Sequence, residues 1–122
     1  MRALFDTNIL IDYLNGIELA REELERFPEA LISVITWTEV MVGTKPEEEI
    51  AVRKFLARFR QVPIDQKVAE RAVLIRRKTR IRLPDAIIRA SAELENALLV
   101  SRNTKDFPEG EPWVRVPYKI NP

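Results

Sequence analysis

Residues 3–16 read ALFDTNILIDYLNG, and this segment indicates the fold class. Its first three residues are apolar without alternation, as expected of a strand that is buried on both faces. Asp6, Thr7 and Asn8 follow, and all three residue types are favourable helix N-caps. We therefore expect a strand, a turn and a helix that ends near Gly16, which is the first unit of an α/β fold.

The rest of the chain alternates strands with helices in the same way. Short apolar runs predict four further strands, at residues 30–33, 62–64, 98–100 and 113–116. Helical spacing and helix-opening prolines predict helices at residues 17–27, 37–42 and 65–79 and after Pro46 and Pro84. This alternation predicts about five parallel strands with right-handed crossovers and helices on both faces. With 122 residues, 46% of them hydrophobic, we expect a single domain over residues 1–122.

Four acidic residues stand where the apolar segments end or turn, namely Asp6, Glu39, Asp85 and Asp106. Ligands of open α/β sheets bind beyond the carboxyl ends of the strands, so acids that are distant in sequence can share one pocket. Carboxylates held together raise one another's pKa values unless a cation lies between them. Oxygen ligands favour Mg²⁺ or Mn²⁺, which can activate a water and stabilise the leaving oxygen of a phosphodiester. The pattern predicts a metal site for phosphoryl chemistry.

Structural explanations exist for these acids as well. Asp6 and Asp85 stand at predicted helix starts, where an acid caps the helix or complements its dipole. Glu39 lies three residues after Thr36, which is the spacing of a capping box in which Glu39 reaches back to the Thr36 backbone. Because all the acids fall at one predicted edge of the sheet, we expect a metal site there.

Composition excludes several other kinds of site. The chain has no cysteine, which rules out disulfides, thiolate zinc sites and a cysteine nucleophile. It has no histidine either, which rules out Ser-His-Asp triads and imidazole metal sites. The apolar run before Asp6 is too short for a signal peptide or a membrane span, so we expect a cytoplasmic protein without a membrane partner.

Basic residues cluster locally although the net charge is only +1. Residues 71–89 contain seven Lys or Arg against one acid, Asp85. This bias suits an RNA backbone that approaches the third acid, but cations at a helix end also complement the helix dipole. Arg82 and Arg102 are the candidates for phosphate contact. Trp37 has two possible roles, stacking on a base or packing in the core or a dimer interface.

Four segments together resemble the PIN-domain ribonucleases, and specifically the VapC toxins. In chain order they read LFDTNILIDYL, SVITWTEVMVG, LPDAIIRA and LVSRNTKDF, at residues 4–14, 33–43, 83–90 and 99–107. The resemblance implies a three-layer α/β/α sandwich with a five-stranded parallel sheet. It also implies Mg²⁺ or Mn²⁺ held chiefly by Asp6 and Asp85, with Glu39 completing the core of a site in which metal-activated water cuts RNA.

The chain departs from this family at the fourth corner of the site. Many members carry aspartate at the position of Asn103, so the fourth carboxylate here comes from Asp106, or water takes its place. The resemblance further implies a VapB-type antitoxin whose tail blocks the site, a homodimer, and transfer RNA as the commonest class of target.

Three other functions are less consistent with the sequence. One is a PIN fold that serves as a binding module without activity. A receiver-type signalling domain would need paired acids after the first strand, where Asp6 stands alone. A haloacid-dehalogenase phosphatase would need a second aspartate at the position of Asn8.

Overall fold

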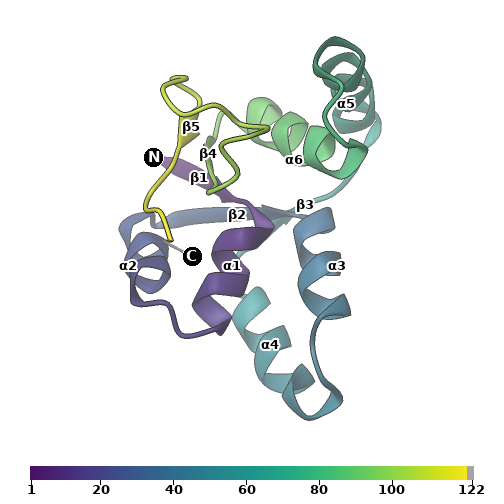
Figure 1. The fold of residues 1–122 in the computed structure, drawn as a ribbon. Helices are drawn as coiled ribbons and strands as arrows, with labels where there is room; N and C mark the ends of the chain where they lie inside the picture. Colours follow the sequence, from purple (N-terminus) through teal and green to yellow (C-terminus); the bar gives the residue numbers. More distant parts are fainter. Residues whose placement is uncertain (121–122) are drawn as a thin grey trace.

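In the computed structural model, which describes residues 1–120, a central sheet separates two layers of helices (Figure 1). Its strands are β1 (Arg2–Phe5), β2 (Glu29–Ser33), β3 (Arg60–Val62), β4 (Leu98–Val100) and β5 (Val114–Arg115). All pairs are parallel, and the spatial order is β3-β2-β1-β4-β5. The expected five-stranded parallel sheet is therefore confirmed, with β1 at its centre.

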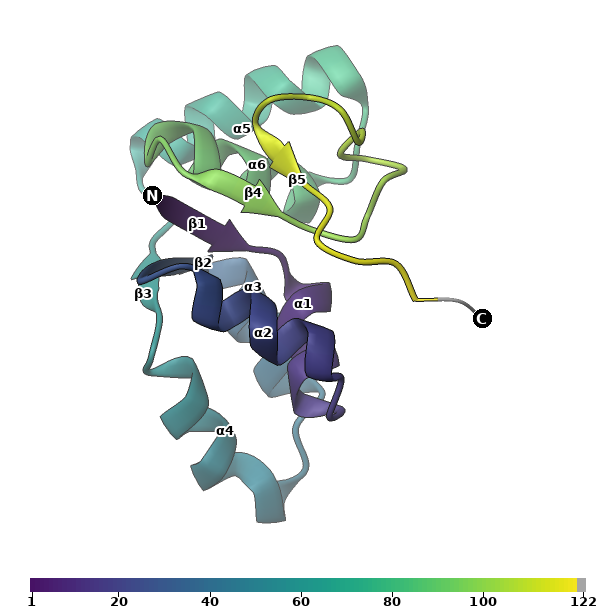
Figure 2. The same cartoon turned by 90° about the vertical axis from the view of Figure 1, so that its left-hand side faces the viewer.

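The helices form two groups on opposite sides of this sheet. They are α1 (Thr7–Leu14), α2 (Glu18–Arg26), α3 (Val34–Val42), α4 (Glu49–Leu56), α5 (Gln66–Thr79) and α6 (Leu83–Leu94), with a short 3-10 turn η1 (Pro46–Glu48) before α4. Figure 2 shows α5 and α6 on one side and α1 to α4 on the other. The three-layer α/β/α sandwich is confirmed. Within residues 1–120, no helix combines the length and hydrophobicity that crossing a membrane requires.

Burial of β1 on both faces holds the two layers together. Ala3, Leu4 and Phe5 are completely buried. Ala3 and Phe5 belong to the core under α1, α2 and α4, whereas Leu4 belongs to the core under α5 and α6. This alternation is the period of a strand, and it places the end of β1 in the interior of the molecule.

The expected start of α3 was wrong for a local reason. We expected α3 to begin at Trp37, but it begins at Val34 because the Ser33 hydroxyl oxygen accepts a hydrogen bond from the Ile35 amide and caps the helix. Thr36 then lies inside the helix, so the expected capping box between Thr36 and Glu39 does not form.

The third strand was expected at residues 62–64 but pairs with β2 over Arg60–Val62. Pro63 follows directly and has no amide proton to donate, which ends the ladder. The last strand is also shorter than expected, since only Val114–Arg115 of residues 113–116 are paired.

A buried ion pair fastens the edge strand β5 to α2. Glu23 is only 2% exposed, and its carboxylate accepts hydrogen bonds from Nε and Nη2 of Arg115, the second at 3.0 Å. Arg26 on the same helix also donates to Glu23, at 3.2 Å. Removing the charge of Glu23 would leave the Arg115 guanidinium without its ionic partner.

We expect Glu23→Gln to lower the free energy of unfolding by about 1–3 kcal/mol, because it breaks a buried, charged hydrogen-bond pair. Urea unfolding followed by circular dichroism measures this. The control is Glu25→Gln on the same helix, whose exposed pair with Arg21 should contribute little. Equal losses in the two variants would contradict this role of the Glu23 pair.

Candidate active site

Asp6 lies at the carboxyl end of β1 and is only 4% exposed. Its Oδ1 accepts a hydrogen bond from the Thr7 amide at 2.8 Å, so Asp6 is the N-cap of α1. Its Oδ2 accepts hydrogen bonds from the Ser101 hydroxyl at 2.7 Å and from Asn8 Nδ2 at 3.2 Å. The Asp6 carboxylate thus caps α1 and also belongs to the acidic site.

Asp85 reaches the same edge of the sheet from the first turn of α6, directly after Pro84. It is 8% exposed, and Arg82 Nε lies 3.4 Å from its Oδ2. Burial is the largest influence on the Asp85 carboxyl and raises its pKa, as do the charges of Asp106 and Glu39, while Arg82 opposes them.

Glu39 comes from α3, which follows β2 on the other side of β1. Its side chain is exposed, and Oε1 accepts a hydrogen bond from the Thr7 hydroxyl at 2.6 Å. The hydroxyl oxygens of Thr7 and the fully buried Thr36 are 3.0 Å apart. Thr7 therefore links the start of α1 to the face of α3 that carries Glu39.

The loop after β4 supplies the fourth side of the site. Asn103 Nδ2 donates to Asp106 Oδ2 at 3.0 Å, and the Asp106 amide donates back to Asn103 Oδ1 at 3.3 Å. The Asn103 amide also donates to Ser101 Oγ at 2.9 Å. Both fourth-corner candidates therefore belong to one small hydrogen-bonded turn.

The four acids act on one another electrostatically. Burial, with a smaller contribution from the charges of Asp85 and Glu39, raises the pKa of Asp6 to about 6, against the hydrogen bonds from Ser101 and Thr7. The charge of Asp106 likewise contributes to the raised pKa of Asp85. The edge formed by β1, β4, α3 and α6 is thus a concentration of negative charge.

The donor set at this edge suits a hard divalent cation, since it consists of carboxylate and amide oxygens. Within residues 1–120, no three carboxylates are close enough to hold one ion in their present rotamers. Asp6 and Asp85 are buried whereas Glu39 is exposed, so recruiting Glu39 as a third carboxylate ligand would require it to turn from the Thr7 hydroxyl toward them. Exposed side chains change rotamer on the picosecond to nanosecond timescale.

The candidate RNA contacts differ in their surroundings. The Arg82 side chain is 81% exposed, whereas that of Arg102 is 28% exposed and donates two hydrogen bonds to Asp12 on α1. Trp37 is half-buried, packs against the core under α1 to α4, and lies beneath the Arg53 guanidinium at 5.4 Å. A core role for Trp37 therefore has direct support.

The PIN domain family model matches residues 3–110. The chain belongs to the PIN-domain family. Ribonuclease VapC10 of Mycobacterium tuberculosis is 32% identical to this PIN domain over 113 residues, which cover 86% of this chain and 85% of that protein. The similarity to a VapC protein confirms the resemblance found in the four sequence segments.

Solved structures agree with this assignment. This PIN domain superposes on a chain of a toxin-antitoxin complex from Klebsiella pneumoniae with 49% identity and a TM-score of 0.91, covering 97% of this chain and 99% of that chain. VapBC2 from Rickettsia felis, bound to a DNA fragment from its promoter, matches with 25% identity and a TM-score of 0.78, covering 93% and 96% of the two chains. The PIN type of the sheet is therefore confirmed.

Sequence reasoning missed three polar residues within or beside the acidic site, namely Thr7, Ser101 and Asp12. Ser101 stands directly after β4, so the end-of-strand argument that selected Asp6 also applies to it. Asp12 has no such signal, because its partners Arg102 and Tyr118 lie 90 and 106 residues away.

The raised pKa of Asp6 predicts a pH-dependent cost of folding. The folded chain binds this proton more tightly than the unfolded chain, so ionisation between about pH 4 and pH 6 lowers the free energy of unfolding. In metal-free buffer we expect Asp6→Asn to be more stable than wild type by on the order of 2 kcal/mol at pH 8, and to lose this advantage near pH 4.

Urea unfolding at the two pH values, in the presence of chelator, measures the difference. Asp65→Asn is the matched control, because Asp65 also caps a helix through its side chain, at the Val68 amide, but is exposed. A pH-independent difference between wild type and Asp6→Asn would contradict a costly charge at Asp6.

Proposed function

We propose that this chain is a metal-dependent endoribonuclease and the toxin of a VapBC-type toxin-antitoxin pair. The observation that carries the proposal is the convergence of Asp6, Glu39, Asp85 and Asp106 at one edge of the sheet, where burial and mutual repulsion raise the pKa values of Asp6 and Asp85. The similarity to a protein named as a ribonuclease supports it.

Asp6 and Asp85 would hold Mg²⁺ or Mn²⁺, with Glu39 and either Asp106 or Asn103 completing the site. When bound, such an ion supplies an activated water and stabilises the charge on the leaving oxygen. Ser101 and the Thr7 amide orient the Asp6 carboxylate, and the exposed Arg82 is available to a phosphate beside Asp85. Attack by water on the phosphorus with the 3′ oxygen as leaving group would break the P–O3′ bond and yield a 3′-hydroxyl and a 5′-phosphate.

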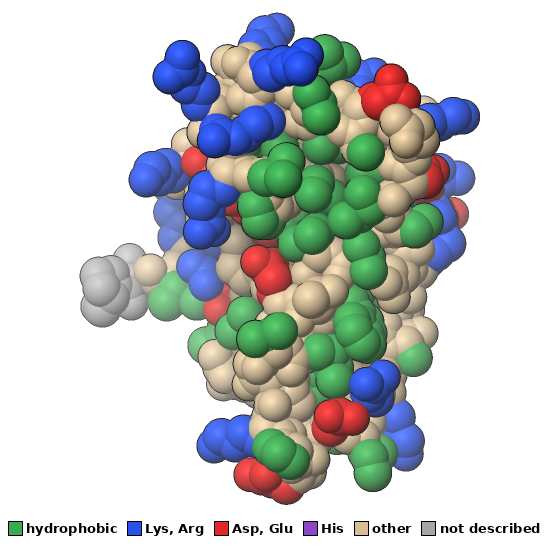
Figure 3. All heavy atoms as spheres, turned by 90° about the vertical axis from the view of Figure 1, so that its right-hand side faces the viewer, with side chains coloured by type: hydrophobic (Ala, Val, Ile, Leu, Met, Phe, Trp, Pro, Cys, Tyr) green, Lys and Arg blue, Asp and Glu red, His purple; other side chains and the backbone are tan. Residues whose placement is uncertain are grey.

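We propose that the substrate is RNA and that the class of RNA cut is transfer RNA. The last turn of α5 carries Arg76, Arg77 and Lys78, and Arg80 and Arg82 follow before the helix that holds Asp85. Figure 3 shows Lys and Arg side chains gathered along one side of a recess in which acidic side chains are visible. Such a border of cations suits a phosphate backbone approaching the acids.

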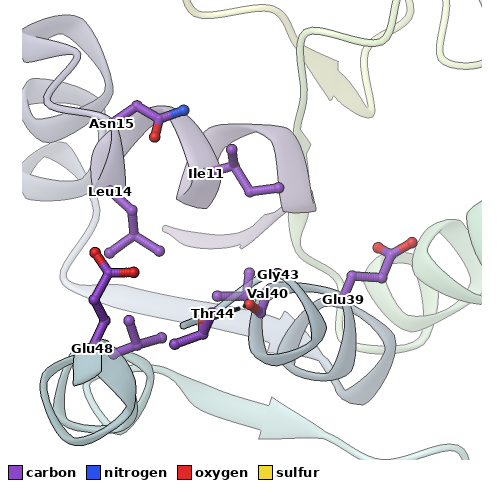
Figure 4. Close-up of a pocket in the computed structure, with 9 residues that line it drawn as sticks. Ile11, Leu14, Asn15, Glu39, Val40, Gly43, Thr44 and Glu48 are labelled. Carbon is purple, nitrogen blue, oxygen red and sulfur yellow. Dashed lines mark hydrogen bonds between the residues drawn. The ribbon is translucent and has the colours of Figure 1, made fainter. Parts of the chain in front are cut away.

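A VapB-type antitoxin is the proposed protein partner. A groove of about 290 Å³ runs between α1, α3 and α4, lined by Ile11, Leu14, Val40 and Val52, and Glu39 lies at its end (Figure 4). Asn15, Thr44 and Glu48 line it as well, and such a combination of apolar and polar side chains suits an amphipathic helix. Solved relatives at 49% and 25% identity are toxin-antitoxin complexes, which supports the pairing.

We also propose that the chain forms a homodimer. Helices α5 and α6 expose Val73, Leu74 and Leu83, and apolar side chains gather over the face seen in Figure 3. A second copy would remove this surface from water.

The activity is tested by incubating antitoxin-free protein with total transfer RNA and Mg²⁺ or Mn²⁺, with and without chelator, and reading cleavage sites from end-labelled RNA. We expect discrete cuts that need the metal and that fall more than about 100-fold in Asp6→Asn and Asp85→Asn, since each removes a charged ligand. The exposed helix-cap variant Asp65→Asn should cut as wild type does.

The chemistry of the product ends provides a second readout from the same reactions. Products ending in a 2′,3′-cyclic phosphate, or cutting that persists in chelator, would contradict the proposed mechanism. Absence of any cutting by folded wild-type protein, including with Mn²⁺ and a broader RNA pool, would favour a binding module without activity.

A further inference from the structure

A second cluster of charged and polar side chains lies beside the acidic site and shares none of its acids. Its centre is Asp12 on α1, which is 6% exposed. Arg102 donates to both Asp12 oxygens, from Nε at 2.6 Å and from Nη2 at 3.0 Å, and the Tyr118 hydroxyl donates to Oδ2 at 2.8 Å. The cluster therefore joins α1 to the loop after β4 and to the C-terminal segment.

Stability need not be the only role of a buried ion pair of this kind. Desolvation of the two charges offsets most of their attraction, and an apolar replacement of similar volume is often as stable. The pair fixes the orientation of the two side chains relative to each other, because a bidentate contact between guanidinium and carboxylate permits only a narrow range of geometries. The position of Arg102 in the chain indicates which residues this contact orients.

Arg102 lies between two residues of the acidic site. On one side, Ser101 donates its hydroxyl to Asp6 at 2.7 Å. On the other side, Asn103 donates to Asp106 at 3.0 Å. Fixing the residue between Ser101 and Asn103 therefore fixes both with respect to α1.

The main chain of Arg102 is docked on α1 as well as its side chain. The Arg102 amide donates to Asn8 Oδ1 at 3.1 Å, and Asn8 Nδ2 donates in turn to Asp6 Oδ2 at 3.2 Å. The loop is thus attached to the first turn of α1 through Asn8 and to its last turn through Asp12.

We infer that Asp12, Arg102 and Tyr118 form a positioning cluster that holds Ser101 and Asn103 against Asp6 and Asp106, so that Arg102 acts on the site through the loop and not by contacting an RNA phosphate. This assigns Arg102 a role different from the one we expect from the sequence. The inference deepens the proposed nuclease function and rests on it.

The chain contains a matched pair for comparison. Glu23 and Arg115 form a buried bidentate contact of the same kind, also between a helix and a segment at the far end of the chain. Neither residue is adjacent in sequence to the four acids, and the Ser101 amide donates to the Arg115 carbonyl at 3.1 Å, a main-chain contact that a change in the Glu23 side chain leaves in place. Loss of either pair should destabilise the fold, but only loss of the Asp12 pair should disturb the site.

The first test compares the kinetics of Asp12→Asn, Arg102→Gln and the double variant in Mn²⁺-dependent RNA cleavage. We expect each to lower kcat by about 10-fold or more at unchanged KM, with no further loss in the double variant, because the two side chains act as one unit. Glu23→Gln should keep the wild-type kcat. A phosphate contact by Arg102 would instead raise KM and weaken the salt dependence in Arg102→Gln alone, which would overturn the inference.

The second test does not depend on activity. Amide hydrogen exchange, measured by NMR in metal-free protein, should become faster at Arg102 and Asn103 in Asp12→Asn and stay as in wild type at Val100, whereas Glu23→Gln should change neither loop amide. Unchanged exchange at Arg102 and Asn103 would overturn the inference. This readout also separates it from the proposed function, since wild-type protein that cuts no RNA still reports whether Asp12 orders the loop.

Tyr118→Phe keeps the ion pair and removes one hydroxyl, so it covers the case in which Asp12→Asn fails to fold. The same changes in kcat and exchange are expected, at smaller size. If Tyr118→Phe matches wild type in both measurements while Asp12→Asn is unfolded, the cluster is structural only and the inference is wrong.

Discussion

Burial of one carboxylate at the end of the central strand is the constraint on which the site depends. Because β1 is buried on both faces, Asp6 at its end is almost completely buried, and its ionisation carries a cost that appears as a pKa raised to about 6. Hydrogen bonds from Ser101 and the Thr7 amide offset part of this cost. The remaining negative potential favours a cation, and the proposed metal would occupy the place where that potential is concentrated.

The order of the strands explains why the other acids meet Asp6. Strand β2 lies on one side of β1 and passes directly into α3, so Glu39 faces the end of β1, while β4 on the other side passes into the loop that carries Asn103 and Asp106. Helix α6 brings Asp85 to the same edge. Parallel strands end at one edge of a sheet, so residues separated by most of the chain contribute to a single site without any long connection across it.

Sequence patterns predicted the parts of this arrangement that have a local cause. Apolar runs followed by Asp6 or Asp85 were sufficient to place both acids at one edge, because strand ends and helix starts have characteristic residues. Position errors arose where a single residue decided the boundary, as with the cap at Ser33 and the missing amide proton of Pro63. The contact of Asp12 with Arg102 lay beyond prediction, since no local pattern distinguishes a buried aspartate in α1 from a solvated one. For that reason the phosphate contact expected of Arg102 and the positioning role proposed for it need an experiment to separate them.

The central claim is that these carboxylates form one metal site, and crystallography with Mn²⁺ tests it most directly. An anomalous difference map from crystals grown with Mn²⁺ should show a peak about 2.0–2.3 Å from carboxylate oxygens of both Asp6 and Asp85. In the same crystals, Glu39 should be turned away from the Thr7 hydroxyl. Crystals of Asp6→Asn grown in the same way should lack it. Wild-type crystals without a peak at this edge, in which Glu39 still accepts the Thr7 hydrogen bond, would contradict the account.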